Sequence, residues 1–68
     1  MKVDTQELKA RMAYNKKFQN EVAANIGMSA NTFRIKLQKG DFKISEIHRL
    51  MKAIPLTMQE VEKIFFAD

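Results

Sequence analysis

The side chains with the most evident chemistry are basic ones, and they gather in the middle of the chain. Residues 9–43 contain eight basic residues against two acids, Glu21 and Asp41, whereas the rest of the chain has four basic and six acidic residues. The net charge is +4 at pH 7 and the isoelectric point is near 9.6. A basic block between acidic ends is typical of a protein with a polyanionic partner, although an ordinary solvated surface has a similar composition.

Residue types needed for catalysis or metal binding are scarce. The chain has no cysteine, which excludes disulfides, zinc–thiolate sites and thiol catalysis, and His48 alone cannot form a multi-histidine metal site or a histidine dyad. We find no glycine-rich phosphate loop, no paired catalytic carboxylates and no nucleophile beside a base. We therefore expect no enzyme, no metal, no cofactor and no small-molecule substrate.

Length and composition predict one small folded domain over residues 1–68. Apolar residues make up 46% of the chain, with two glycines and one proline, as in a helical domain rather than a disordered tail. No apolar run approaches the roughly 18 residues that cross a bilayer, and the chain turns polar at Lys2, unlike a signal peptide. We expect a reduced, soluble, cytoplasmic protein.

Capping residues and glycines divide the chain into five expected helices, with no strand. Side chains suited to accept a hydrogen bond from the first helical turn are Asp4, Ser29, Ser45 and Thr57. Glu7 and Glu60 follow two of these caps by three residues and predict capping boxes. The first helix should end near Asn15. The second helix should span about 19–26 and the third about 30–38. The fourth should end before Pro55, and the fifth should follow Thr57.

The apolar residues of each expected helix recur at the spacing of a single face. They predict a core with contributions from all five helices. The expected inward residues are Leu8 and Met12; Val22, Ala23 and Ile26; Phe33 and Leu37; Ile47, Leu50, Met51 and Ile54; and Val61, Ile64 and Phe65.

The stretch from Phe18 to Gly40 contains two short expected helices separated by Gly27-Met28-Ser29. Small Ala23 allows the second helix to approach the third closely, and Gly27 turns the chain. Ile26, Met28 and Phe33 would fill the angle between the helices. This arrangement predicts a helix-turn-helix, in which a steep interhelical angle directs the second helix of the pair toward a major groove.

The residue pattern of this stretch also recurs in known proteins. Its matching positions are Gln19, Val22, Ala23, Ile26, Gly27, Met28, Ser29, Thr32 and Phe33. The pattern resembles the helix-turn-helix of Cro and phage-repressor proteins, the lambda-repressor-like or XRE family, which also has one helix before the motif and two after it. The resemblance implies a compact five-helix domain that binds double-stranded DNA as a homodimer and regulates transcription in a phage or mobile element.

The resemblance also implies roles for individual residues. The start of the third helix would read bases, through Ala30, Asn31, Arg34 and Ile35. An amide such as Asn31 can pair twice with adenine, and an arginine can fork onto guanine. Contacts to phosphates would position the helix without reading sequence, and the residues expected to make them are Lys16, Lys17, Gln19, Ser29, Lys36, Lys39 and Lys43.

Two departures from the family pattern favour a different class of function. Phe18 stands where relatives usually have a threonine or serine cap, and Ile35 stands where many carry a polar reader. Both, together with Ala30 at the first position of the third helix, suit a small modulator or anti-repressor that keeps the fold but docks on another regulator protein. Exposure of Ile35 and Met28 would favour that alternative.

The adjacent residues Phe65 and Phe66 cannot easily face one core, because neighbouring helical positions point about 100° apart. If Phe65 is inward, Phe66 is half exposed, and an exposed aromatic suggests an interface. We therefore expect a dimer or partner contact formed by Phe66 with Met58 or Ile64.

Overall fold

The computed structural model describes residues 2–66, which form five helices with a π-helical turn continuing the fifth. This confirms the expected all-α, five-helix fold. The one strand-like pairing in this part of the chain is an isolated bridge between Lys2 and Asp41. No helix among these residues has the length and apolar character needed to cross a membrane. The elements are α1 (Thr5–Tyr14), α2 (Gln19–Asn25), α3 (Ala30–Lys39), α4 (Ile44–Ala53), α5 (Met58–Val61) and η1 (Glu62–Phe66).

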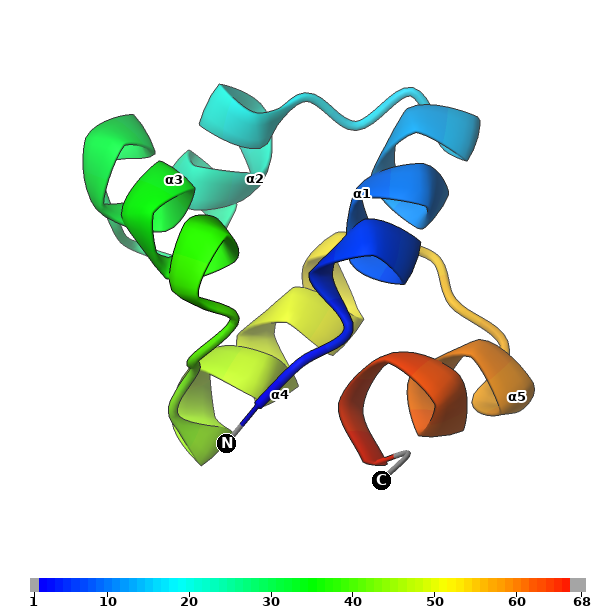
Figure 1. Cartoon of the computed structure of the whole chain (residues 1–68). Helices are drawn as coiled ribbons and strands as arrows, with labels where there is room; N and C mark the ends of the chain where they lie inside the picture. The colour runs from blue at the N-terminus through cyan, green and yellow to red at the C-terminus, as the bar shows by residue number, and fades with distance from the viewer. Residues whose placement is uncertain (1, 67–68) are drawn as a thin grey trace.

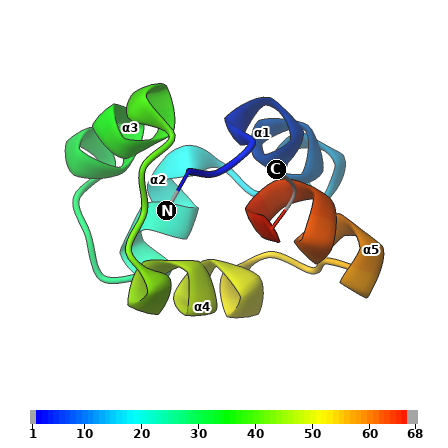
Figure 2. The ribbon, with the colours of Figure 1, turned by 60° about the horizontal axis from the view of Figure 1, so that its bottom comes forward.

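Helices α2 and α3 contact each other at one side of the molecule (Figure 1). Helix α5 lies on the opposite side from α3 in both views of the ribbon, and α4 runs below α1 and α2 in the turned view (Figure 2). The longest dimension of the Cα trace is 27 Å. Because α3 and α5 lie on opposite sides, each can contact a different partner.

A single hydrophobic core joins all five helices, and the expected inward residues form it. All of them are buried except Met51, which is partly buried against the core. Phe42 also belongs to the core, with 1% of its surface exposed, and its ring packs edge-on against Phe33 at 6.1 Å between centroids. Phe42 was not predicted because it lies in the α3–α4 loop, outside any helical apolar pattern.

Most expected caps are present. The side chains of Ser29 and Thr57 accept hydrogen bonds from the third residue after each, and Glu60 completes the box by accepting from Thr57 N–H at 2.9 Å. The Asp4 carboxylate accepts from Glu7 N–H at 3.1 Å, but Glu7 does not return the bond. The N–H of Asp4 instead donates to the Ile64 carbonyl, so the box expected at α1 is only half formed.

The expected Ser45 cap is wrong, because α4 begins earlier. Lys43 occupies the cap position and Ile44 is the first helical residue. The Glu46 carboxylate reaches back three residues and accepts from the Lys43 N–H at 2.8 Å. This bond satisfies an amide at the start of the helix and places Ser45 inside the first turn.

The segment before α1 ties distant parts of the chain together. Val3 N–H donates to the Gly40 carbonyl at the end of α3, and Asp4 N–H donates to the Ile64 carbonyl in η1, both at 2.8 Å. Gly40 has a φ of +70°, and a Cβ there would lie 3.3 Å from the Val3 carbonyl oxygen. Glycine therefore allows both the left-handed end of α3 and the close approach of Val3.

Candidate nucleic-acid interface

The turn between α2 and α3 has the local structure expected from its sequence. Gly27 has a φ of +77°, in the region where glycine is favoured. Met28 N–H donates to the Ala23 carbonyl at 3.0 Å, which closes the end of α2. Ala23, Ile26 and Phe33 are buried in the angle between the helices, and Met28 is partly buried against them.

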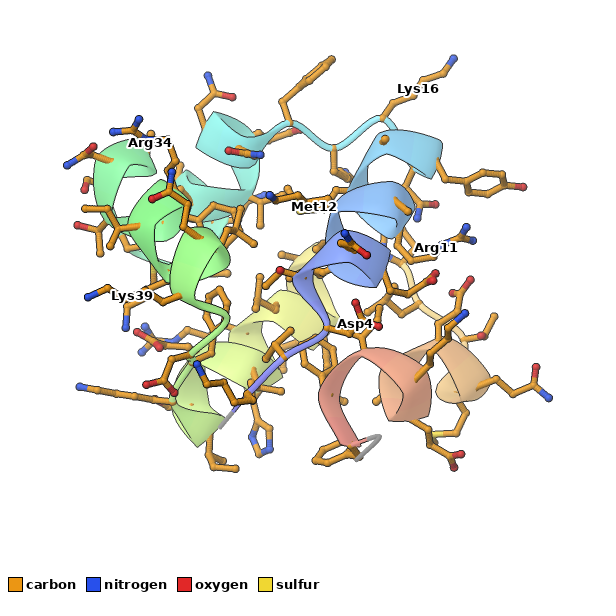
Figure 3. All side chains as sticks on the ribbon, in the orientation of Figure 1. Asp4, Arg11, Met12, Lys16, Arg34 and Lys39 are labelled. Carbon is orange, nitrogen blue, oxygen red and sulfur yellow. The ribbon has the colours of Figure 1, made fainter. Side chains whose placement is uncertain are left out.

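The start of α3 displays the predicted base-reading side chains. Ala30, Asn31 and Arg34 are exposed, and Ile35 is 40% exposed. Arg34 Nη2 donates a hydrogen bond to Asn31 Oδ1, so the two polar side chains form a pair on the surface. Figure 3 shows Arg34 and Lys39 extending outward from α3. The predicted readers therefore lie together on one exposed helix.

The charge of α3 is entirely positive, because its ten residues include three cations and no acid. Lys39 is exposed, but Lys36 forms an ion pair with Glu46 at 3.3 Å and has a side chain only 26% exposed. Partial burial opposes ionisation of Glu46, but the hydrogen bond from Lys43 N–H and the nearby Lys36 ammonium outweigh it and hold the pKa below its usual value. Lys36 is thus already paired, whereas none of the ion pairs described for residues 2–66 includes Lys39.

The other predicted phosphate contacts come from segments before and after α3. Lys16 is exposed in the left-handed region, with a φ of +57°, and Lys17 is partly buried. Gln19 is the exposed first residue of α2, and Lys43 is exposed at the start of α4.

Ser29 has a definite structural role as a cap. Its hydroxyl accepts from Thr32 N–H at 3.1 Å and donates to Thr32 Oγ1 at 2.9 Å. A phosphate oxygen accepts hydrogen bonds, so it would compete with Thr32 Oγ1 for the Ser29 hydroxyl proton, while the cap from Thr32 N–H could remain.

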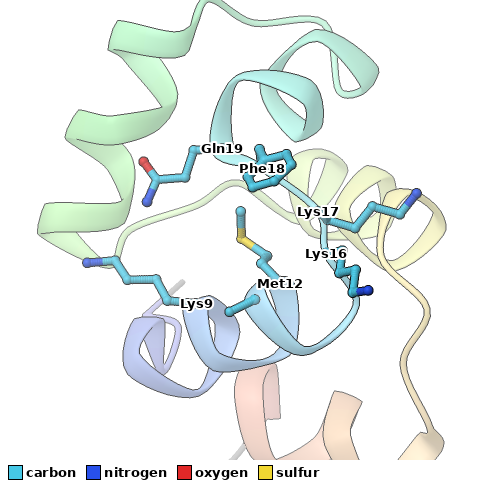
Figure 4. Close-up of a pocket in the computed structure, with 7 residues that line it drawn as sticks. Lys9, Met12, Lys16, Lys17, Phe18 and Gln19 are labelled. Atoms are coloured by element: carbon cyan, nitrogen blue, oxygen red, sulfur yellow. The ribbon is translucent and has the colours of Figure 1, made fainter.

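A hollow of about 320 Å³ lies where α1 meets the start of α2 (Figure 4). Met12 and Phe18 line it with apolar surface, and Lys9 and Gln19 extend from it toward α3 in this view. The lining is completed by Ala13, Lys16 and Lys17. Sequence reasoning counted Lys9 in the basic block but did not single it out, since its place in the hollow depends on how α1 packs against α2. We call the space lined by these residues the α1–α2 hollow.

The predicted dimer residues differ in accessibility. Phe66 is 54% exposed and Met58 is 74% exposed, whereas Phe65 is 2% exposed, as its position beside Phe66 predicts. Ile64 is 2% exposed, so including it in an interface was wrong: its side chain faces the core and offers almost no surface to a partner. Met58 and Phe66 remain accessible.

No group of three or more His, Asp or Glu side chains that could hold a metal occurs in residues 2–66, and His48 is exposed.

The exposure that would favour a protein-docking modulator is found only in part. Ile35 is exposed, but Met28 is partly buried.

Comparisons of the chain with protein-family models, with curated proteins and with solved structures find no match.

Proposed function

We propose that this chain is a sequence-specific DNA-binding transcriptional regulator of the Cro and phage-repressor type. The observation that carries the proposal is the exposed face of α3, where Asn31 and Arg34 lie side by side on a helix without acidic residues. The major groove of B-DNA, about 12 Å wide, admits an α-helix, and amide and guanidinium groups are the side chains that most often read base edges there.

Phosphate contacts would supply most of the affinity. Exposed Lys39 lies on α3 itself, while Lys16 and Lys43 lie in the segments before α2 and α4. Cations distributed around a reading helix can bind both backbones of a groove and fix the register of the helix. Gln19, at the start of α2, is suited to donate to a phosphate from its amide.

The proposal includes a two-fold dimer formed along α5. Met58 and Phe66 are large apolar side chains exposed on α5 and η1, on the side away from α3. In a dimer joined through α5, the two α3 helices would lie at opposite ends of the dimer. Half-sites one helical turn apart require a separation of about 34–36 Å, which suits two molecules whose longest Cα dimension is 27 Å. Such a dimer would occlude a promoter without catalysis or a cofactor.

A selection of random duplex oligonucleotides with the purified protein, at about 150 mM salt, tests this function. We expect enrichment of a two-fold symmetric motif, whose half-site spacing also reports the dimer geometry. Recovery of no motif, with binding that disappears as salt rises, would contradict sequence-specific recognition and leave only attraction to a polyanion.

A further inference from the structure

The α1–α2 hollow has an apolar surface that the fold does not use. Met12 is 3% exposed and belongs to the core, but Phe18 is 71% exposed beside it. Exposed aromatic side chains next to a concave surface are favourable anchors for a partner, because covering them removes apolar area from water. The first observation is therefore an unpartnered aromatic ring at a preformed hollow.

Phe18 also occupies a position where another residue type would serve the helix better. It is the N-cap of α2, with an extended backbone at φ −86° and ψ 152°, and its side chain makes no capping hydrogen bond. Serine, threonine, aspartate or asparagine at a cap usually stabilises a helix by about 1 kcal/mol relative to a side chain that cannot accept. Neither capping nor core packing therefore accounts for a phenylalanine here.

The charge around the hollow is of one sign. Lys9, Lys16 and Lys17 contribute to its lining and no carboxylate does. The ion pairs described for residues 2–66 involve other cations, so none of these three ammonium groups is paired with a carboxylate in that part of the chain. The hollow thus favours an occupant that is apolar at its centre and acidic at its edges.

We propose that the α1–α2 hollow is a docking site for an acidic segment of a partner protein. One apolar side chain of the segment packs against Phe18, and its carboxylates lie against Lys9, Lys16 and Lys17. A DNA backbone would satisfy the lysines but has no side chain to insert against the ring, which is why a protein segment fits better. The proposal does not depend on DNA binding, although an occupant would compete with DNA for Lys16 and Gln19.

The test is a selection from a display library of random 12-residue peptides against the purified chain, followed by fluorescence anisotropy with the enriched peptides. Phe18→Ser is the main variant, because it removes the ring and supplies a cap, so lost binding cannot be attributed to unfolding. Tyr14→Ala is the matched control, since Tyr14 is an equally exposed aromatic, 76% accessible, outside the hollow. Lys9→Glu tests the charge, with Lys52→Glu, also exposed, as its control.

We expect enriched peptides with one large apolar residue flanked by aspartate or glutamate. Phe18→Ser and Lys9→Glu should each weaken their binding by about tenfold or more, as for a central anchor, while Tyr14→Ala and Lys52→Glu should change it less than about twofold. Failure to enrich such peptides, or equal binding by Phe18→Ser and the wild type, would overturn the proposal. A loss confined to duplex DNA binding would overturn it too, and would assign the hollow to the DNA interface.

Discussion

Arg34 donates a hydrogen bond to Asn31 Oδ1, so the two side chains proposed to read bases are paired with each other on the free protein. The amide oxygen has a second lone pair and can still accept, while the Asn31 amide group and the remaining Arg34 N–H groups can donate. Guanine offers two acceptors, O6 and N7, in the major groove, which a guanidinium can contact through two N–H groups. We therefore expect Arg34 to favour guanine.

The first prediction concerns this pair. Arg34→Ala should cost about 1–3 kcal/mol of operator binding and abolish the preference at one guanine. Arg34→Lys keeps the charge but loses the planar fork, so it should lose most of the same preference. In a double-mutant cycle, Asn31→Ala and Arg34→Ala should be non-additive because the residues are in contact. Titrations of matched duplexes that differ at one base pair measure these effects, and equal losses on specific and scrambled DNA would contradict a reading role.

The second prediction distinguishes two lysines of α3. Lys39→Ala should weaken binding to all sequences and reduce the slope of log K against log salt by about one unit. Lys36→Ala should change that slope less, because the Lys36 ammonium is already paired with Glu46 at 3.3 Å. Binding titrations over a series of salt concentrations give both slopes. A larger change for Lys36 than for Lys39 would contradict the assignment.

The third prediction concerns stability at the start of α2. Phe18→Ser should raise the free energy of unfolding by about 1 kcal/mol, because serine can accept a hydrogen bond from the first turn. For a domain of this size the melting temperature should rise by about 4–8 °C. Phe18→Ala lacks the hydroxyl and should show no comparable gain. Thermal unfolding followed by circular dichroism compares the three proteins, and an unchanged melting temperature for Phe18→Ser would show that the cap does not form.

The fourth prediction separates the two adjacent phenylalanines. Phe66→Ala should shift a dimer toward monomer in sedimentation at high micromolar concentration, with little effect on folding, since Phe66 is 54% exposed. Phe65→Ala should instead destabilise the fold by about 3–5 kcal/mol, because Phe65 is buried. A monomeric profile that is the same for wild type and Phe66→Ala would rule out the proposed interface.

The fifth prediction is a pH dependence at Glu46. Its pKa is lowered in the folded state, so its ionised form stabilises the fold above the unfolded pKa of about 4.3, and this contribution is lost as pH falls through the lower folded value. Glu46→Gln keeps an oxygen for the Lys43 N–H but removes the charge. Wild type should be more stable than Glu46→Gln at pH 7, and the difference should close in acid. Denaturant unfolding at several pH values measures it, and a constant difference would refute this account.

The helices were predictable from sequence because caps and apolar spacing are local signals. Ser29, Thr57 and the two glycines mark boundaries that the structure confirms. The start of α4 was not found, because Ser45 offered a conventional cap whereas the bond from Lys43 N–H to Glu46 uses a residue rarely considered as one. Phe42 was missed because a single apolar residue in a loop has no periodicity.

The candidate site was predictable only in part. Asn31 is exposed because it lies roughly opposite Phe33 on α3, and Arg34 follows it by one turn, so helical spacing sufficed. The engagement of Lys36 by Glu46 depends on how α4 packs beside α3, and the α1–α2 hollow depends on a junction between helices. Such relations arise from tertiary packing, which a local pattern does not encode.

The hydrogen bond from Asp4 N–H to the Ile64 carbonyl has a consequence for how the chain folds. It closes a loop of nearly the whole chain, and the bond from Val3 to Gly40 closes a second long loop. Local helical turns form without bringing distant segments together, whereas each long closure costs chain entropy that only later contacts repay. The helices should therefore form early and the segment before α1 should dock last, so substitutions at Val3 should speed unfolding more than they slow folding.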